Sequence, residues 1–80
     1  MAVVVFSSEL QILTGEAETR SDKIIYRDIV ADIAARYPRL DADRLLEMAV
    51  AIDGEIVHTP LLERIEQDSE VHFLYRISGG

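Results

Sequence analysis

The chain has 80 residues, of which 49% are hydrophobic, and a formal net charge of −7. This length supports one small domain with a single core, and the composition is typical of a folded protein rather than a disordered one. A nucleic-acid binder needs clustered basic residues to displace counterions, but the eight Lys and Arg residues are scattered along the chain. The acidic balance suits docking to a basic face of a partner, and it serves equally well to keep the chain soluble.

Several classes of functional site lack the residues that they need. The absence of cysteine excludes disulfides, thiol nucleophiles and thiolate zinc sites, and His58 and His72 lack the short spacing of a metal motif. The longest apolar run, Met48–Ile52, is too short to span a bilayer, which takes about 20 residues. The apolar start, Ala2–Phe6, is too short for a signal peptide. We therefore expect a cytoplasmic protein that binds no metal and is not catalytic alone.

The first part of the chain predicts a strand, a helical turn and a second strand. Ala2–Phe6 is apolar and mostly β-branched, which favours a strand that is buried or paired on both sides. Serines then offer helix-capping groups, and Leu10 and Leu13 form one face of a short helical turn that ends at Gly15. The polar segment Glu16–Arg20 is expected to be an edge strand.

The main helix is predicted over Arg27–Tyr37. Ile29, Ile33 and Tyr37 recur every four residues and form an apolar stripe along one face. Pro38 disfavours helical geometry at the residue before it and so ends the helix.

A hairpin is predicted in the second half of the chain. Asp41–Glu47 reads as a short helical turn capped by its first residue. The apolar strand Met48–Ile52 follows, and Asp53 with Gly54 accepts the positive φ angles of a tight turn. Glu55–His58 then forms the return strand.

The last strand is predicted over Glu70–Ile77. Val71 and Phe73 point to one side of this strand, whereas His72 and Leu74 point to the other. Strands at both ends of the chain, one main helix and a hairpin indicate an α+β roll. Because a single helix covers only one face of such a sheet, the other face is solvated or serves for docking.

Four segments, in this order, carry a family resemblance: Phe6–Gly15 (FSSELQILTG), Ile29–Pro38 (IVADIAARYP), Ala51–Val57 (AIDGEIV), and Asp68–Leu74 (DSEVHFL) with the final Ile77–Gly80 (ISGG). Together they resemble the MoaD/ThiS family of ubiquitin-like sulfur carriers, and more closely its MoaD side, the small subunit of molybdopterin synthase. Each segment alone is a weak signal, and their joint order with the ending at Gly80 makes a strong one. The resemblance implies a β-grasp fold, with a mixed sheet and one main helix packed on one face. It also implies a domain over residues 1–76 and a flexible Gly-Gly tail over 77–80.

The chain departs from the family pattern at several positions. Tyr75 and Arg76 replace the usual proline pair before the tail, which makes the exit of the tail less rigid. Asp68 stands where a turn glycine is usual, and Asp53 where asparagine is usual. Ile25 stands where a threonine often caps the helix. These departures do not change the expected fold, but they leave open which subfamily the chain resembles most and hence which pathway it serves.

The resemblance implies that the C-terminus carries the chemistry. A ubiquitin-activating-type adenylyltransferase would use ATP to adenylate Gly80, and sulfur from a persulfide donor would replace AMP to give a C-terminal thioglycine. The carrier itself would bind no cofactor. In the MoaD setting, the large catalytic subunit of molybdopterin synthase holds the pterin precursor and receives the tail. Gly79 and Gly80 lack a Cβ and so suit a narrow channel, and the chain from Arg76 to Gly80 reaches about 17 Å when extended.

The resemblance also implies a docking surface for these partners. It places Phe6, Ile56 and Leu74 at partner-docking positions, with Arg76 and Ser78 in the segment that leads to the terminal glycines. Phe6 and Ile56 fit the core equally well. Leu74 fits docking better, because its neighbours point to the other side of the strand. Arg76 can pair with an acidic partner residue at the exit of the tail or remain solvated.

Other functions stay open at this point. The same carrier chemistry can serve thiamine synthesis, tRNA thiolation or cysteine synthesis. A different class of function is a ubiquitin-like modifier that is joined through Gly80 to lysines of target proteins. A third reading is a plain β-grasp interaction module whose glycine tail is an inert chain end.

Overall fold

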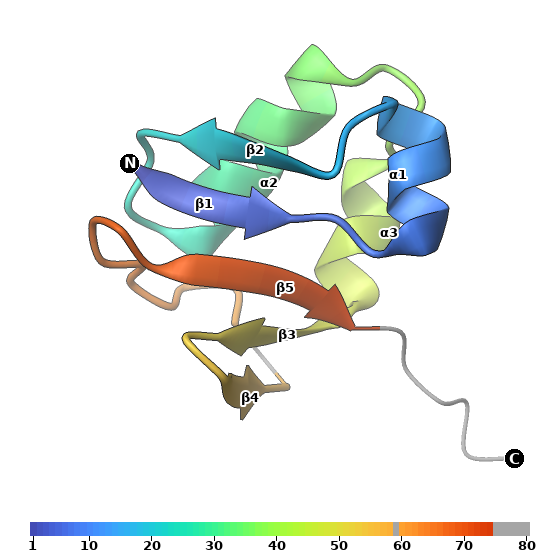
Figure 1. The fold of residues 1–80 in the computed structure, drawn as a ribbon. Coiled ribbons are helices and arrows are strands. Elements are labelled where there is room, and N and C mark those ends of the chain that lie inside the picture. The colour runs from blue at the N-terminus through green and yellow to red at the C-terminus, as the bar shows by residue number, and fades with distance from the viewer. Residues whose placement is uncertain (59, 75–80) are drawn as a thin grey trace, which may run out of the picture.

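The computed structural model describes residues 1–58 and 60–74. The strands are β1 (Ala2–Val5), β2 (Glu18–Ser21), β3 (Ala49–Ile52), β4 (Glu55–Val57) and β5 (Glu70–Leu74). The helices are α1 (Ser8–Thr14), α2 (Tyr26–Arg36) and α3 (Ala42–Glu47). The strands form one sheet in the order β2-β1-β5-β3-β4, in which β1 and β5 are parallel and the other pairs are antiparallel. Helices α2 and α3 lie behind this sheet, and α1 lies beside its end (Figure 1). This is the α+β roll that the sequence predicts.

The core lies between α2 and one face of the sheet. Val4, Val50 and Val71 from three strands are fully buried against Ile29 and Ile33 of α2. Alternate residues of β1 and β5 are only half-buried, so the other face of the sheet remains open. The first strand is therefore paired on both edges, as predicted, and it is buried on one face.

Helix α2 follows its sequence signals closely. It begins one residue before the predicted start and ends at Arg36, with Tyr37 as the C-cap in extended geometry before Pro38. At the other end, Ile25 is the N-cap and provides no side-chain hydrogen bond. The helix is thus held by its apolar stripe rather than by its cap.

A polar network ties the edge strand β2 to α2. The Ser21 hydroxyl is buried and donates a hydrogen bond to Asp32 Oδ2 at 2.7 Å. Arg36 Nη2 donates to the carbonyl of Arg20 at 2.6 Å, and Arg36 Nη1 donates to Thr19 Oγ1 at 3.0 Å. These bonds give a short, polar strand a fixed place at the edge of the sheet.

The turns use residues that tolerate positive φ angles. Gly15 ends α1 at φ 77°, and the β3–β4 hairpin turns at Asp53 (φ 51°) and Gly54 (φ 85°). Asp68 adopts φ 69°. The Asp41 side chain caps α3 by accepting a hydrogen bond from the Asp43 N–H at 3.0 Å, as predicted.

Candidate functional site

The predicted chemistry lies in the C-terminal segment. Arg76, Ser78, Gly79 and Gly80 fall outside the described residues, so the structure defines only where this segment starts. It starts after Leu74, at the end of β5, which is the middle strand of the sheet. In Figure 1 this end of β5 lies on the same side of the molecule as α1 and α3.

The open face of the sheet is built by a row of residues from four strands. The register places Val5 of β1 beside His72 of β5, His72 beside Ala51 of β3, and Ala51 beside Ile56 of β4. Opposed residues on neighbouring strands point to the same face. We call this surface the docking face, after the role that the sequence predicts for Ile56 and Leu74, and define it by five residues: Val5, Ala51, Ile56, His72 and Leu74.

Leu74 joins the docking face to the start of the C-terminal segment. Its Cα pairs with that of Ala49, and it is half-buried while its neighbour Phe73 is 3% exposed in the core. The alternation predicted for this strand is confirmed over its described residues. Leu74 therefore presents its side chain on the docking face at the last described position of the chain.

Charged groups flank the apolar part of the docking face. Glu18 of β2 pairs with Val5, and Glu70 of β5 lies beside Val3. His72 Nε2 lies 3.7 Å from Glu70 Oε1, an ion pair that exists when the imidazole is protonated. Arg20 of β2 also pairs with Val3, so a partner that covers this face meets apolar side chains together with charges of both signs.

Phe6 and Ile56, for which the sequence left both the core and the docking role open, differ in burial in the structure. Phe6 is 2% exposed and packs edge-on against Tyr37, with ring centroids 5.6 Å apart. It follows β1, and its burial favours the core alternative. Ile56 is 58% exposed and stands in the row of the docking face. Of the predicted docking residues that the structure describes, burial therefore leaves Ile56 and Leu74 within reach of a partner.

The structure adds two features to the site that the sequence analysis did not predict. Val5 and Ala51 belong to the docking face, and only the pairing of the strands shows that they stand beside His72. Asp53 fastens the hairpin that carries Ile56 to the start of β5. Hydrogen bonds from the Glu70 N–H and the Ser69 hydroxyl hold the pKa of the Asp53 carboxyl below its usual value.

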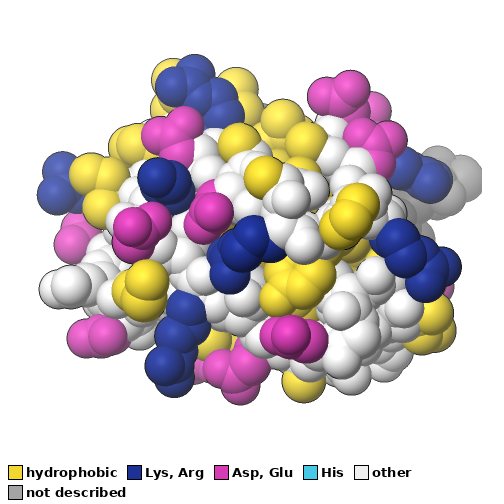
Figure 2. Space-filling view, turned by 90° about the horizontal axis from the view of Figure 1, so that it is seen from above, with side chains coloured by type: hydrophobic (Ala, Val, Ile, Leu, Met, Phe, Trp, Pro, Cys, Tyr) yellow, Lys and Arg dark blue, Asp and Glu magenta, His cyan; other side chains and the backbone are white. Residues whose placement is uncertain are grey.

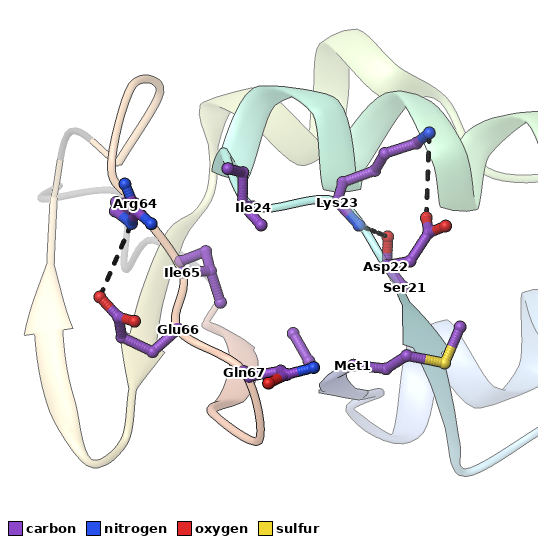
Figure 3. A pocket seen from close by; sticks show the side chains of 10 residues that line it. Met1, Ser21, Asp22, Lys23, Ile24, Arg64, Ile65, Glu66 and Gln67 are labelled. Carbon is purple, nitrogen blue, oxygen red and sulfur yellow. Dashed lines mark hydrogen bonds and ion pairs between the residues drawn. The ribbon is translucent and has the colours of Figure 1, made fainter.

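A separate small pocket lies at the opposite end of the sheet (Figure 3). It has a volume of about 280 Å³ and is lined in part by Met1 and Gln67, which precede the parallel strands β1 and β5. Exposed ion pairs border it: Lys23 with Asp22 at 3.8 Å and Arg64 with Glu66 at 3.7 Å. Among the predicted site residues that the structure describes, none lines this pocket.

The face of the molecule that is seen from above is mixed in charge (Figure 2). In the view from above, basic and acidic side chains alternate with small hydrophobic patches (Figure 2). Within residues 1–58 and 60–74, no group of three or more His, Asp or Glu side chains is placed to hold a metal ion. No helix in the described part of the chain is both long enough and apolar enough to cross a membrane.

Comparison with known proteins gives structural matches only. No protein-family model matches the sequence, and no curated protein matches it significantly. SAMP1 from Haloferax volcanii superposes with a TM-score of 0.76 at 18% identity, over 99% of this chain and 98% of that one. A chain of the BexX/CysO complex of Amycolatopsis orientalis superposes with a TM-score of 0.79 at 20% identity, over 100% of both chains. At these identities the likeness shows the fold, and this chain therefore has the β-grasp, ubiquitin-like architecture of these proteins.

Proposed function

We propose that this chain is a ubiquitin-like sulfur carrier, and that the carboxylate of Gly80, when it is the free C-terminus, holds sulfur as a thiocarboxylate. The observation that carries the proposal is the place of Leu74, which stands on the docking face just before the C-terminal segment whose sequence ends in Gly79 and Gly80. The four family-like segments and the fold shared with SAMP1 and CysO support it. The folded body presents the tail, and the partners supply the catalytic groups.

The chemistry requires an activating partner because a free carboxylate is a poor electrophile. A ubiquitin-activating-type adenylyltransferase joins the Gly80 carboxylate to the α-phosphate of ATP and releases pyrophosphate. The terminal sulfur of a persulfide donor then attacks the acyl carbon, and AMP leaves with the electron pair of the C–O bond. Two thiol equivalents then reduce the S–S bond of the resulting acyl disulfide: the first attacks the donor sulfur and expels the thiocarboxylate of Gly80, and the second frees the donor thiol as the two reducing thiols leave joined as a disulfide. The product needs no cysteine in this chain, which has none.

The docking face supplies the binding that such a transfer needs. Its apolar residues include Ile56 on the edge strand β4, which is 58% exposed although it is a large hydrophobic side chain. CysO has been crystallised in a complex with BexX, so a β-grasp chain in that pair is assembled with another protein. By analogy, we assign the docking face of this chain to the enzyme that receives the tail.

The acceptor that the resemblance favours is molybdopterin synthase. In this proposal the chain is the small subunit, and the large catalytic subunit holds the pterin precursor while the tail delivers sulfur to it. The second candidate keeps the carrier chemistry and changes the acceptor, to a thiazole precursor, a tRNA base or a precursor of cysteine. A protein modifier joined through Gly80 is a further alternative, and isopeptide-linked Gly80 fragments recovered from cells would favour it.

Intact mass spectrometry tests the carrier chemistry. The full chain is incubated with a purified adenylyltransferase of the ubiquitin-activating type, ATP, a persulfide donor and a thiol. We expect the exchange of one C-terminal oxygen for sulfur, and no exchange when ATP is left out or when Gly79 and Gly80 are deleted. An unchanged mass, under conditions that convert a known carrier, would overturn the proposal. Addition of the large subunit and the pterin precursor to the charged chain then separates the molybdopterin pathway from the others.

A further inference from the structure

The sheet has two edge strands, β2 and β4, and they differ in whether their outer backbone groups are free. Beside β2, the Val3 N–H donates to the Ser69 carbonyl at 2.8 Å, so the backbone groups of Val3 point toward β5. Its antiparallel partner Arg20 therefore turns its own N–H and C=O outward, to the free edge of β2. Arg36 Nη2 donates to this Arg20 carbonyl at 2.6 Å, so a side chain of the protein itself already occupies the β2 edge.

The edge of β4 is open at Ile56. The Asp53 N–H donates to the Glu70 carbonyl at 2.9 Å, which directs the backbone of Asp53 toward β5. Because residues along a strand direct their backbone groups to alternate sides, Ala51 also bonds toward β5 and not toward its β4 partner Ile56. The N–H and C=O of Ile56 consequently point away from the sheet. Within residues 1–58 and 60–74, no other backbone group bonds to either of them.

Ile56 is thus available to a partner through both its side chain and its backbone. The side chain is 58% exposed and belongs to the docking face. The backbone lies on β4, the outermost strand on its side of the sheet (Figure 1). A strand edge with unpaired N–H and C=O groups is a template for one more strand. A protein that covers the docking face at Ile56 therefore also reaches a free strand edge.

We propose that the enzyme that receives the tail adds an extended segment of its own chain to the edge of β4 and so continues the sheet of the carrier. This inference rests on the proposed function and names the kind of segment by which the acceptor enzyme holds the docking face. The N–H and the C=O of Ile56 each form a hydrogen bond with that segment. The enzyme residue opposite Ile56 points to the same face of the sheet, so it is apolar and packs beside the Ile56 side chain.

The edge selects an extended segment rather than a helix. The free groups of Ile56 require an acceptor for the N–H and a donor for the C=O, and an extended chain offers both at the spacing of a strand. The backbone groups inside a helix are already bonded within it and cannot pair with them. The exposed side chain alone would fit either kind of segment, and the backbone decides for the strand.

A second copy of this chain is a poorer occupant of the edge than an enzyme. Strand β4 covers only Glu55–Val57, and only its middle residue directs its backbone outward, so two copies joined here would share the bonds of Ile56 alone. Each copy also has a net charge of −7, and like charges repel. The enzyme adds to the same bonds its contacts with the docking face and with the tail, so a short edge suffices.

The test removes one backbone N–H and keeps every side chain. In a chemically synthesised full chain, the α-hydroxy acid analogue of isoleucine at position 56 replaces the Ile56 N–H by an ester oxygen, which cannot donate. The matched control has the same replacement at Arg20, whose N–H points outward from the opposite edge. In both variants the ester also weakens the preceding carbonyl, which bonds inside the sheet, so the comparison isolates the outer edge. Thermal unfolding verifies that both variants fold.

Titration calorimetry with the purified large subunit of molybdopterin synthase measures the effect. We expect the ester at Ile56 to weaken binding about threefold to tenfold, the range for one lost hydrogen bond, and the ester at Arg20 to bind as the native chain does. Native affinity of the Ile56 ester, or equal weakening by both esters, would overturn this inference alone. Absence of binding by the native chain would instead overturn the proposed acceptor, and this inference with it.

Amide hydrogen exchange is a second measurement, and it needs no variant. The Ile56 N–H should exchange at least about tenfold more slowly in the complex than in the free chain, whereas the exchange of the outward Arg20 N–H should stay the same. An Ile56 exchange rate that is equal in both states would overturn the inference. A dimer of the free chain that the ester at Ile56 dissociates in sedimentation would assign the edge to a second copy, and would overturn it as well.

Discussion

The Asp53 carboxylate accepts a hydrogen bond from the Ser69 hydroxyl at 2.7 Å, although the two residues are 16 positions apart in the chain. Its other oxygen accepts the Glu70 N–H at 2.9 Å, and the Asp53 N–H donates to the Glu70 carbonyl at 2.9 Å. The turn of the β3–β4 hairpin is thereby fastened to the start of β5. The same contact positions Ile56 on the docking face and supports the strand that leads to the tail.

The Asp53 contact predicts a stability difference that depends on pH. Hydrogen bonds from Glu70 and Ser69 lower the pKa of Asp53 in the folded state, below an unfolded value of about 3.9. Its stabilising effect is therefore full above the unfolded pKa and is lost as the pH falls through the folded pKa. Asp53→Asn keeps an acceptor and tolerates the turn geometry but cannot ionise.

Urea unfolding of both proteins across the acid range measures this effect. The stability of the native chain relative to Asp53→Asn should be constant near neutral pH and should decline below pH of about 4. The ionised carboxylate is reported by the way in which this stability difference changes with pH, and not by the size of the difference at a single pH. A difference that does not vary with pH would contradict the assignment.

Asp68 is predicted to limit the stability of the fold. Its φ of 69° lies in the left-handed region, which costs a residue with a Cβ roughly 1–2 kcal/mol and costs glycine little. Replacement of Asp68 by glycine removes this cost, but part of the stability gained is offset because glycine has more conformational freedom in the unfolded chain. We expect Asp68→Gly to raise the free energy of unfolding by about 0.5 kcal/mol and Asp68→Ala to lower it. Equal or lower stability of the glycine variant in chemical denaturation would show that Asp68 is not strained.

Phe6 is predicted to act through the core. Truncation to alanine removes a side chain that is 2% exposed and its edge-on contact with Tyr37, which should cost about 3–5 kcal/mol. A domain of this size has only a few kcal/mol to spare, so Phe6→Ala is expected to be largely unfolded in circular dichroism. Phe6→Leu keeps most of the apolar volume and should fold and accept sulfur. A fully stable Phe6→Ala that fails only in partner binding would restore the docking role.

Ile56 is predicted to act through the surface. Because it is 58% exposed, Ile56→Asp should leave the unfolding midpoint nearly unchanged. Binding to the large subunit of molybdopterin synthase, measured by titration calorimetry, should weaken about tenfold or more. Leu62→Asp, at a side chain that is 67% exposed and outside the docking face, is the control and should bind as the native chain does. Equal loss of binding in both variants would indicate a general charge effect rather than a defined face.

Much of the fold can be predicted from the sequence because its strongest signals are local. The apolar stripe of α2 and the stop at Pro38 depend on spacing and on proline sterics, and they define the helix to within a residue or so. The hairpin turn is confirmed at Asp53 and Gly54, since both residues tolerate positive φ. Local chemistry alone decides such elements.

The features that need tertiary contacts could not be predicted in the same way. The polar segment of β2 is placed by Arg36 and by the bond between Ser21 and Asp32, and no local pattern reports either contact. Phe6 follows β1, and its place in the sequence fits both the core and the docking role. Its contact with Tyr37, which the sequence does not report, decides for the core. The outward direction of the Ile56 backbone depends on the pairing of β3 with β5, so only the assembled sheet reveals it.

The central claim is that the terminal carboxyl group of Gly80 is the reactive group, which is activated and then carries the sulfur. The most direct measurement compares the native chain with a variant that has one extra, uncleaved residue after Gly80, in cells that lack the small subunit of molybdopterin synthase. Intact mass of the recovered proteins verifies both C-termini. The account predicts that the native chain restores molybdopterin and that the extended chain, although folded, restores none. Full restoration by the extended chain would contradict the account, because its Gly80 has no free carboxyl group to activate.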